Sequence, residues 1–221
     1  MSYYRNFKIV LGNPLWRIYL QWAYKTGIQD LEKLRVKPNF SKKDFTALLC
    51  GVGNENTADE FIKFILERNE KAKIIIIDIG NEQIEAVKKL VATEYPNINI
   101  VVKQTDVLKL GAYLGKSSID WIETDGFLEY FDPDRLGELL SIWKTILAKN
   151  GFITFRDFIT EGFFGKTIDT IKMGIAKIWL GVTLHPHDKN EFLNMLESFG
   201  FRYFEASSCF PTYRRYLLIN R

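Results

Sequence analysis

Short apolar runs alternate with amphipathic stretches from Phe45 to the end of the chain, which is the pattern of an α/β fold. The runs predict five strands in chain order, over 46–53, 73–80, 98–107, 119–125 and 152–158. The stretches between them place apolar residues three and four positions apart, as amphipathic helices do. Strands that alternate with helices predict a parallel, doubly wound sheet.

The end of the chain follows a different pattern. Two strand-like runs, 201–208 and 213–220, are separated by only four residues. A parallel crossover needs a dozen or more residues, so these runs predict an antiparallel hairpin. The expected fold is therefore α/β, with a doubly wound, mostly parallel seven-stranded sheet that ends in a C-terminal antiparallel hairpin.

Several helix starts can be read from the sequence. Thr57 and Glu60 have the spacing of a capping box, and Asp188 with Glu191 repeats it. Asp132 precedes a proline and predicts the start of a long helix that ends at Asn150-Gly151. Two apolar stripes predict further helices: Leu15, Ile18, Tyr19 and Trp22 near the start, and Ile168, Ile171, Ile175 and Ile178 before the last helix.

Composition narrows the class of protein. The 221 residues are 47% hydrophobic and 26% charged, which is typical of a globular domain and excludes a disordered chain. No apolar run reaches the roughly 18 residues of a membrane span, and two cysteines favour a reducing compartment. We therefore expect a soluble cytoplasmic protein without a transmembrane segment. Residues 1–43 hold nine Lys or Arg against two Asp or Glu, a charge that suits an anionic substrate, nucleic acid or a membrane surface.

Polar residues follow the predicted parallel strands, where open α/β sheets bind ligands. In chain order they are Gly51, Gly53 and Asn54, then Asp78, then Asp106, then Thr124 and Asp125 with Glu129 one turn beyond. Glycines let a ligand approach the backbone, and a carboxylate can accept hydrogen bonds from a ribose diol or an amino group. Each residue alone could equally serve a turn or a helix cap, but successive strand ends carry them.

Five segments resemble the class I S-adenosylmethionine-dependent methyltransferases between about residues 45 and 160: ALLCGVGNE, IIIIDIGNEQIEAV, VVKQTDVLKL, IDWIETDGFLEYF and KTILAKNGFITFRDF. The resemblance implies S-adenosylmethionine as the cofactor. It implies that Gly51, Gly53 and Asn54 lie at the methionine part, Asp78 and Ile79 at the ribose, Asp106 and Val107 at the adenine, and Thr124 and Asp125 at the sulfonium. The helical spacing in residues 1–43 predicts an N-terminal helical extension ahead of a Rossmann-like domain (44–221). Residues 160–187 lie outside the motifs and are rich in aromatic residues, so we expect them to form an insertion that covers the substrate.

The sequence departs from the family at two positions. Leu49 stands where the family commonly has an acidic residue, and Glu55 replaces the third glycine. Two other functions stay open. A nicotinamide-dependent oxidoreductase also has a glycine turn and an acidic strand end, but its fingerprint needs a small residue where Asn56 stands. A binding module of the same fold, without catalysis, is the second alternative.

The resemblance implies methyl transfer to an oxygen or nitrogen atom, and we expect a small acceptor that is partly apolar or anionic. Nucleic acid stays open as an acceptor, although no Pro-Pro-aromatic motif follows the fourth strand. Asp125, Glu129, His185 and His187 are the candidates for a catalytic base. We expect no metal site, because two histidines without a nearby Cys or acidic cluster are typical of a loop. The sequence does not choose among these bases and leaves the oligomeric state open.

Overall fold

A computed structural model describes residue 4, residues 11–208 and residues 213–220. The strands form one sheet in the order β3-β2-β1-β4-β5-β8-β7, with β6 paired to β5. They are β1 (Thr46–Cys50), β2 (Lys73–Asp78), β3 (Ile100–Gln104), β4 (Ile119–Asp125), β5 (Leu147–Thr160), β6 (His187–Asp188), β7 (Phe201–Ser207) and β8 (Tyr213–Asn220). The longer helices are α2 (Pro14–Asp30), α3 (Glu55–Leu66), α4 (Asn81–Glu94), α5 (Pro133–Ile146), α6 (Gly162–Ile175) and α7 (Lys189–Ser198). Short helical segments are η1 (Leu31–Leu34), η2 (Val107–Ala112), η3 (Leu128–Tyr130) and the π-helical η4 (Ala176–Leu180).

The predicted sheet is confirmed. The first five strands pair in parallel, and β8 runs antiparallel to both β5 and β7, as the predicted hairpin requires. The structure adds an eighth strand, because His187 and Asp188 pair in parallel with the end of β5. The connection over residues 209–212 lies outside the described residues.

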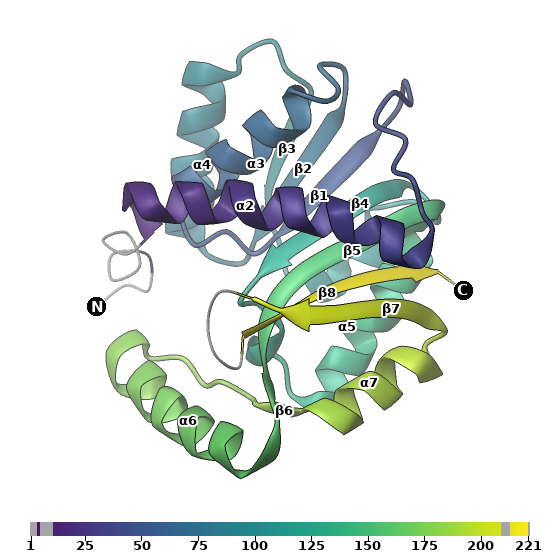
Figure 1. Cartoon of the computed structure of the whole chain (residues 1–221). Coiled ribbons are helices and arrows are strands. Elements are labelled where there is room, and N and C mark those ends of the chain that lie inside the picture. Colours follow the sequence, from purple (N-terminus) through teal and green to yellow (C-terminus); the bar gives the residue numbers. More distant parts are fainter. Residues whose placement is uncertain (1–3, 5–10, 209–212, 221) are drawn as a thin grey trace.

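Helices cover both faces of the sheet (Figure 1). One core lies under α2 and α3 and contains Tyr24, Phe61 and Trp121, and the other lies under α5 and α7 and contains Trp143 and Phe192. Helix α6 is set apart from these helices beyond the end of β5. Across the described ranges, no helix has the length and apolar character to cross a membrane.

Helix α2 does not bury the face that the hydrophobic spacing suggests. Leu15, Ile18 and Trp22 are exposed, and the helix instead buries Leu20, Ala23, Tyr24 and Gly27. Gly27 explains the choice of face: a Cβ there would lie only 3.1 Å from Cγ2 of Thr154 on β5. The small residue lets the helix lie close to the sheet, and the larger apolar residues point outward.

Two predicted helix boundaries are wrong. Asn54, not Thr57, is the N-cap of α3, because the Asn54 side chain accepts a hydrogen bond from the Thr57 N–H at 3.1 Å. Helix α5 ends at Ile146 rather than at Asn150-Gly151, because Leu147 is already extended and pairs with Ile119. The N-caps predicted at Asp132 and Asp188 are confirmed.

Candidate active site

The glycine turn after β1 is held by the carboxylate that ends β2. Asp78 accepts a hydrogen bond from the Val52 N–H through Oδ2 and from the Gly80 N–H through Oδ1, both at 2.6 Å. Burial raises the pKa of the Asp78 carboxyl, although these two N–H bonds act in the opposite direction. Gly51 has a φ of +76°, a left-handed conformation that favours glycine. Asp78 therefore fixes the shape of the turn, and the residue is only partly buried there.

Two further observations bear on whether a ligand could bind at this turn. Asn54 is fully buried, and its Nδ2 has no hydrogen-bond partner among the described residues. A buried donor without an acceptor is costly and marks a place for an absent polar group. A Cβ on Gly51 would lie 2.6 Å from the Phe127 ring, and one on Gly53 would lie 2.2 Å from Cδ1 of Leu11. Movable apolar side chains thus fill the space over the glycine backbone.

The ends of β2 and β3 lie side by side, joined by the bond from the Thr105 N–H to the Asp78 carbonyl at 2.9 Å. Asp106 follows β3 and caps η2, because its Oδ1 accepts the Leu108 N–H at 3.0 Å. Val107 is buried behind it, and Ile79 is exposed after β2. The predicted ribose and adenine residues therefore share one edge.

Asp125, the predicted sulfonium residue, receives hydrogen bonds from three different elements. Arg156 of β5 donates to Oδ2 from Nε at 3.0 Å and from Nη2 at 2.8 Å. Tyr19 of α2 donates to the same oxygen at 3.1 Å, and Tyr213 of β8 donates to Oδ1. The Thr124 hydroxyl donates to the Cys50 carbonyl at 2.7 Å and ties β4 to β1. Asp125 is thus held in place beside the glycine turn.

A buried ion network lies directly below Asp125. Arg156 also donates to Glu123, and both side chains are almost completely buried. Desolvation raises the pKa of Glu123 to about 7, more than the Arg156 charge lowers it. Glu123 faces Leu49 across the β1–β4 pair. A carboxylate therefore lies one strand away from the position at which the class I methyltransferases commonly have an acidic residue. This network was not predicted, although its members Glu123 and Arg156 are charged residues inside the apolar runs IDWIETD and FITFRDF.

The segment after β4 brings together the other predicted bases. Glu129 is buried and accepts the Lys172 ammonium of α6 at 2.6 Å. Burial also raises the pKa of the Glu129 carboxyl, while Lys172 lowers it. The His185 backbone N–H donates to the Glu129 carbonyl at 2.7 Å, and His187 Nε2 lies 3.1 Å from the Leu128 carbonyl. Burial lowers the pKa of the His187 ring, which favours its neutral form.

Asp157, which was also not predicted as a site residue, holds this segment. Its Oδ2 accepts hydrogen bonds from the backbone N–H groups of Phe127 and Leu128 at 2.8 and 2.6 Å.

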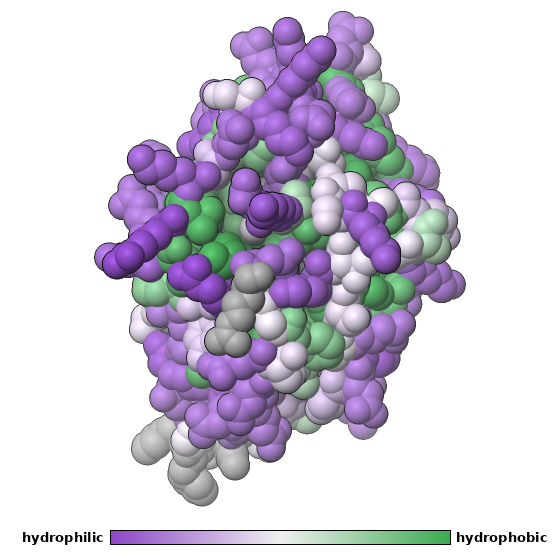
Figure 2. Space-filling view, turned by 90° about the vertical axis from the view of Figure 1, so that its right-hand side faces the viewer, coloured by the Kyte–Doolittle hydropathy of each residue, from purple (hydrophilic) through white to green (hydrophobic). Residues whose placement is uncertain are grey.

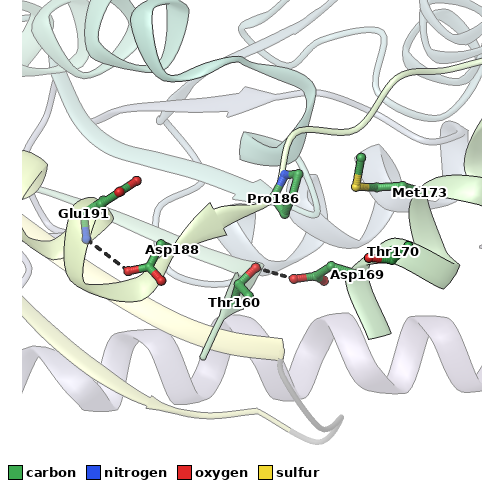
Figure 3. Close-up of a pocket in the computed structure, with 7 residues that line it drawn as sticks. All are labelled: Thr160, Asp169, Thr170, Met173, Pro186, Asp188 and Glu191. Carbon is green, nitrogen blue, oxygen red and sulfur yellow. Dashed lines mark hydrogen bonds between the residues drawn. The ribbon is translucent and has the colours of Figure 1, made fainter. Parts of the chain in front are cut away.

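A cavity of about 310 Å³ lies between α6 and the ends of β5 and β6 (Figure 3). It is lined by Thr160, Asp169, Thr170, Met173, Pro186, Asp188 and Glu191. The predicted insertion therefore provides most of this lining.

Comparison with known proteins identifies the fold. No protein-family model matches the sequence, and no curated protein is similar to it in sequence. Among solved structures, the chain is similar to magnesium protoporphyrin IX methyltransferase (ChlM) from Synechocystis with bound SAH, with a TM-score of 0.62 and 13% identity over 91% of this chain and 83% of that one. It is also similar to a SAM-dependent methyltransferase from Archaeoglobus fulgidus, with a TM-score of 0.57 and 16% identity over 89% and 93% of the chains.

A third similar structure is the mitomycin 7-O-methyltransferase MmcR, with a TM-score of 0.59 and 13% identity. The match covers 80% of this chain and 49% of MmcR, so the chain spans about half the length of that enzyme. These similarities, together with the strand order, show that the chain has the fold of the class I methyltransferases.

Proposed function

We propose that the chain is an S-adenosylmethionine-dependent methyltransferase that acts on an oxygen or nitrogen atom of a small molecule. The observation that carries the proposal is the hydrogen bond that Asp78 accepts from the Val52 N–H of the glycine turn, at the centre of the sheet. The chain runs outward from β1 to β3 and then restarts at β4 on the other side of β1, so this edge is the topological switch point. Open α/β sheets bind ligands there.

The residues at this edge fit the cofactor. Asn54 Nδ2 offers a buried donor to the methionine carboxylate, and Asp78 has lone pairs beyond those used by Val52 and Gly80 to accept ribose hydroxyls. Asp106 and Val107 would accept the adenine at the next strand end. The Leu11 and Phe127 side chains must leave the glycine backbone for the cofactor to approach. When bound, the sulfonium supplies an electrophilic methyl group for in-line displacement.

The acceptor would meet the Asp125 side of the site. Tyr19 and Tyr213 hold the Asp125 carboxylate from two elements, so the three side chains form a positioned polar wall that can orient an acceptor. For proton removal we propose Glu129, which is buried in the segment after β4, with His185, whose backbone N–H donates to the Glu129 carbonyl at 2.7 Å, as the second candidate. The excess of basic residues in 1–43 favours an anionic acceptor, and the aromatic residues of that segment, among them Trp16 and Trp22, favour a partly apolar one.

Calorimetric titration of the full chain with S-adenosylhomocysteine and, separately, with NADH tests the proposal. We expect heat of binding for S-adenosylhomocysteine and none for NADH. Binding of NADH alone would replace the proposal with the oxidoreductase alternative. Transfer of a labelled methyl group to the small-molecule fraction of a cell extract then distinguishes an enzyme from a module that binds the cofactor without catalysis.

A further inference from the structure

The buried ion network beside the glycine turn contains more acidic groups than basic ones. Its one guanidinium, that of Arg156, pairs with two carboxylates, those of Glu123 and Asp125. Within the part of the chain that the structure describes, neither carboxylate has a second Lys or Arg partner within 4 Å. Two negative charges and one positive charge leave the network with a net charge of −1 when both carboxyls are ionised.

The phenols that surround the network do not change this charge. Tyr19 and Tyr213 donate hydrogen bonds to Asp125, and the Tyr24 ring lies 5.7 Å from the guanidinium. Burial, together with the neighbouring carboxylates, raises the pKa of Tyr24 and of Tyr213 well above the usual value of a phenol. Both phenols are therefore neutral at physiological pH.

The acidic residues on either side do not neutralise the network either. Glu129 is paired with Lys172 at 2.6 Å, so the two together carry no net charge. Burial raises the pKa of Asp157 to about 8, which leaves this carboxyl mostly protonated at neutral pH. Asp78 at the end of β2 is a further acid, not a base. These neighbours therefore leave the negative charge of the network uncompensated.

The network lies next to the glycine turn. The Thr124 hydroxyl donates to the carbonyl of the last residue of β1 at 2.7 Å, and a Cβ on Gly51 would lie 2.6 Å from the Phe127 ring. Between these two contacts, the Asp125 side chain keeps 10% of its surface exposed, while Glu123 is completely buried behind it. A ligand on the glycine turn would thus meet Asp125 directly and feel the charge of Glu123 through it.

The two forms of the proposed cofactor differ in charge at this place. S-adenosylmethionine has a positively charged sulfonium, and its product S-adenosylhomocysteine has a neutral thioether. An uncompensated negative charge in a partly buried site attracts the first and not the second. We infer that the network of Glu123, Arg156 and Asp125 makes the site prefer S-adenosylmethionine over S-adenosylhomocysteine. This inference rests on the proposed function.

Glu123 is the residue that determines this preference. Arg156 neutralises one carboxylate, and Glu123→Gln would leave it paired with Asp125 alone, without net charge. A site with the preference releases its product readily, so that product inhibition stays weak. Glu123 is faced by Arg156 of β5, Tyr24 of α2 and Cys50 of β1, and by Asp125 on its own strand. Because burial raises the pKa of Glu123 to about 7, its charge is present above that pH and lost below it.

Separate calorimetric titrations of the full chain with S-adenosylmethionine and with S-adenosylhomocysteine test the inference, and they need no acceptor. At pH 8 we expect the wild type to bind S-adenosylmethionine at least about threefold more tightly, as one nearby charge requires. In Glu123→Gln the two affinities should be about equal. At pH 6 the wild-type preference should fall by at least about half. Circular dichroism checks that the variants are folded.

Asp120→Asn is the matched control, because it removes a carboxylate from the same strand at the opposite edge of the sheet. Asp120 lies near the start of β4, and β8, which is antiparallel to β5, ends at that same edge. Figure 2 shows the side of the molecule on which β8 ends, where hydrophilic side chains cover most of the surface. The control should keep the wild-type preference at both pH values.

Three outcomes would overturn the inference and leave the proposed function intact: equal or tighter binding of S-adenosylhomocysteine by the wild type at pH 8, an unchanged preference in folded Glu123→Gln, or a wild-type preference that does not grow between pH 6 and pH 8. The last measurement uses the wild type alone and decides the matter even if the variant does not fold. Absence of binding by both ligands would instead overturn the proposed function, and the inference with it.

Discussion

Replacing Asp78 should weaken both cofactor binding and the fold, because this carboxylate shapes the glycine turn and also faces the proposed ribose. Asp78→Ala removes the acceptor of two backbone N–H groups and of both ribose hydroxyls. Asp78→Asn keeps a neutral oxygen that can hold one of the two N–H groups but removes the charge. The asparagine variant is therefore the milder change to the fold.

The magnitude follows from the bonds involved. A hydrogen bond to a charged group contributes roughly 1.5–3 kcal/mol, so two hydroxyls on one carboxylate contribute about 3–6 kcal/mol, which is at least a hundredfold in affinity. We expect at least that loss for Asp78→Ala and at least a tenfold loss for Asp78→Asn. Asp78→Ala should also lower the free energy of unfolding by about 1–3 kcal/mol for each N–H group left without an acceptor.

Titration calorimetry with S-adenosylhomocysteine measures the affinity, and urea unfolding measures the stability of each variant. The matched control is Asp120→Asn. Asp120 also accepts a backbone N–H of β1, from Thr46 at 2.9 Å, but at the opposite edge of the sheet. The control should keep wild-type affinity. Wild-type affinity in a folded Asp78→Ala protein would refute the reasoning and leave Asp78 as a structural residue of the turn.

Three further changes test the surrounding structure. Arg156→Met leaves buried carboxylates without a positive partner and should lower the free energy of unfolding, measured in urea, by about 3–5 kcal/mol. Lys88→Met removes a partner from an exposed ion pair and should lower it by under ~1 kcal/mol; equal effects would contradict the buried network. Burial raises the pKa of Asp157 to about 8, so this carboxyl contributes stability at low pH that is lost as the pH rises toward 8. The thermal midpoint should therefore decrease as the pH is raised from 5 to 8, and it should decrease less in Asp157→Asn. Identical pH profiles of the wild type and this variant would contradict the expectation. Gly51→Ala places a Cβ 2.6 Å from the Phe127 ring and forces an alanine into the left-handed conformation, so it should lower the free energy of unfolding by at least about 1–2 kcal/mol. Gly111→Ala, with open space around the new Cβ, should leave the free energy of unfolding unchanged.

The strand ends were predictable because strands and turns leave strong local signals. Four consecutive isoleucines before Asp78 mark a buried parallel strand, and the four-residue gap before Tyr213 leaves only a hairpin. The order of strands around β1 then brings Gly51, Asp78, Asp106 and Asp125 to one edge without further information. The polar edge of the site therefore follows from local sequence and topology together.

Helix faces and the buried network were not predictable in this way. The spacing of Ile171 and Ile175 indicates a helix but not which side of it meets the sheet, and contacts through Asp169 decide that. Likewise, Arg156 and Glu123 stand 33 positions apart in sequence, and only the pairing of β5 with β4 shows that one neutralises the other. Long-range packing determines both features.

The structure of the chain crystallised with S-adenosylhomocysteine tests the central claim most directly. We predict density for the methionine part on the Gly51–Gly53 backbone, with the ribose on Asp78 and the adenine beside Asp106. The Leu11 and Phe127 side chains should be displaced from the positions they hold against the two glycines. Density for the ligand elsewhere, or an unchanged glycine turn still covered by Leu11 and Phe127 at saturating ligand, would contradict the proposed cofactor site.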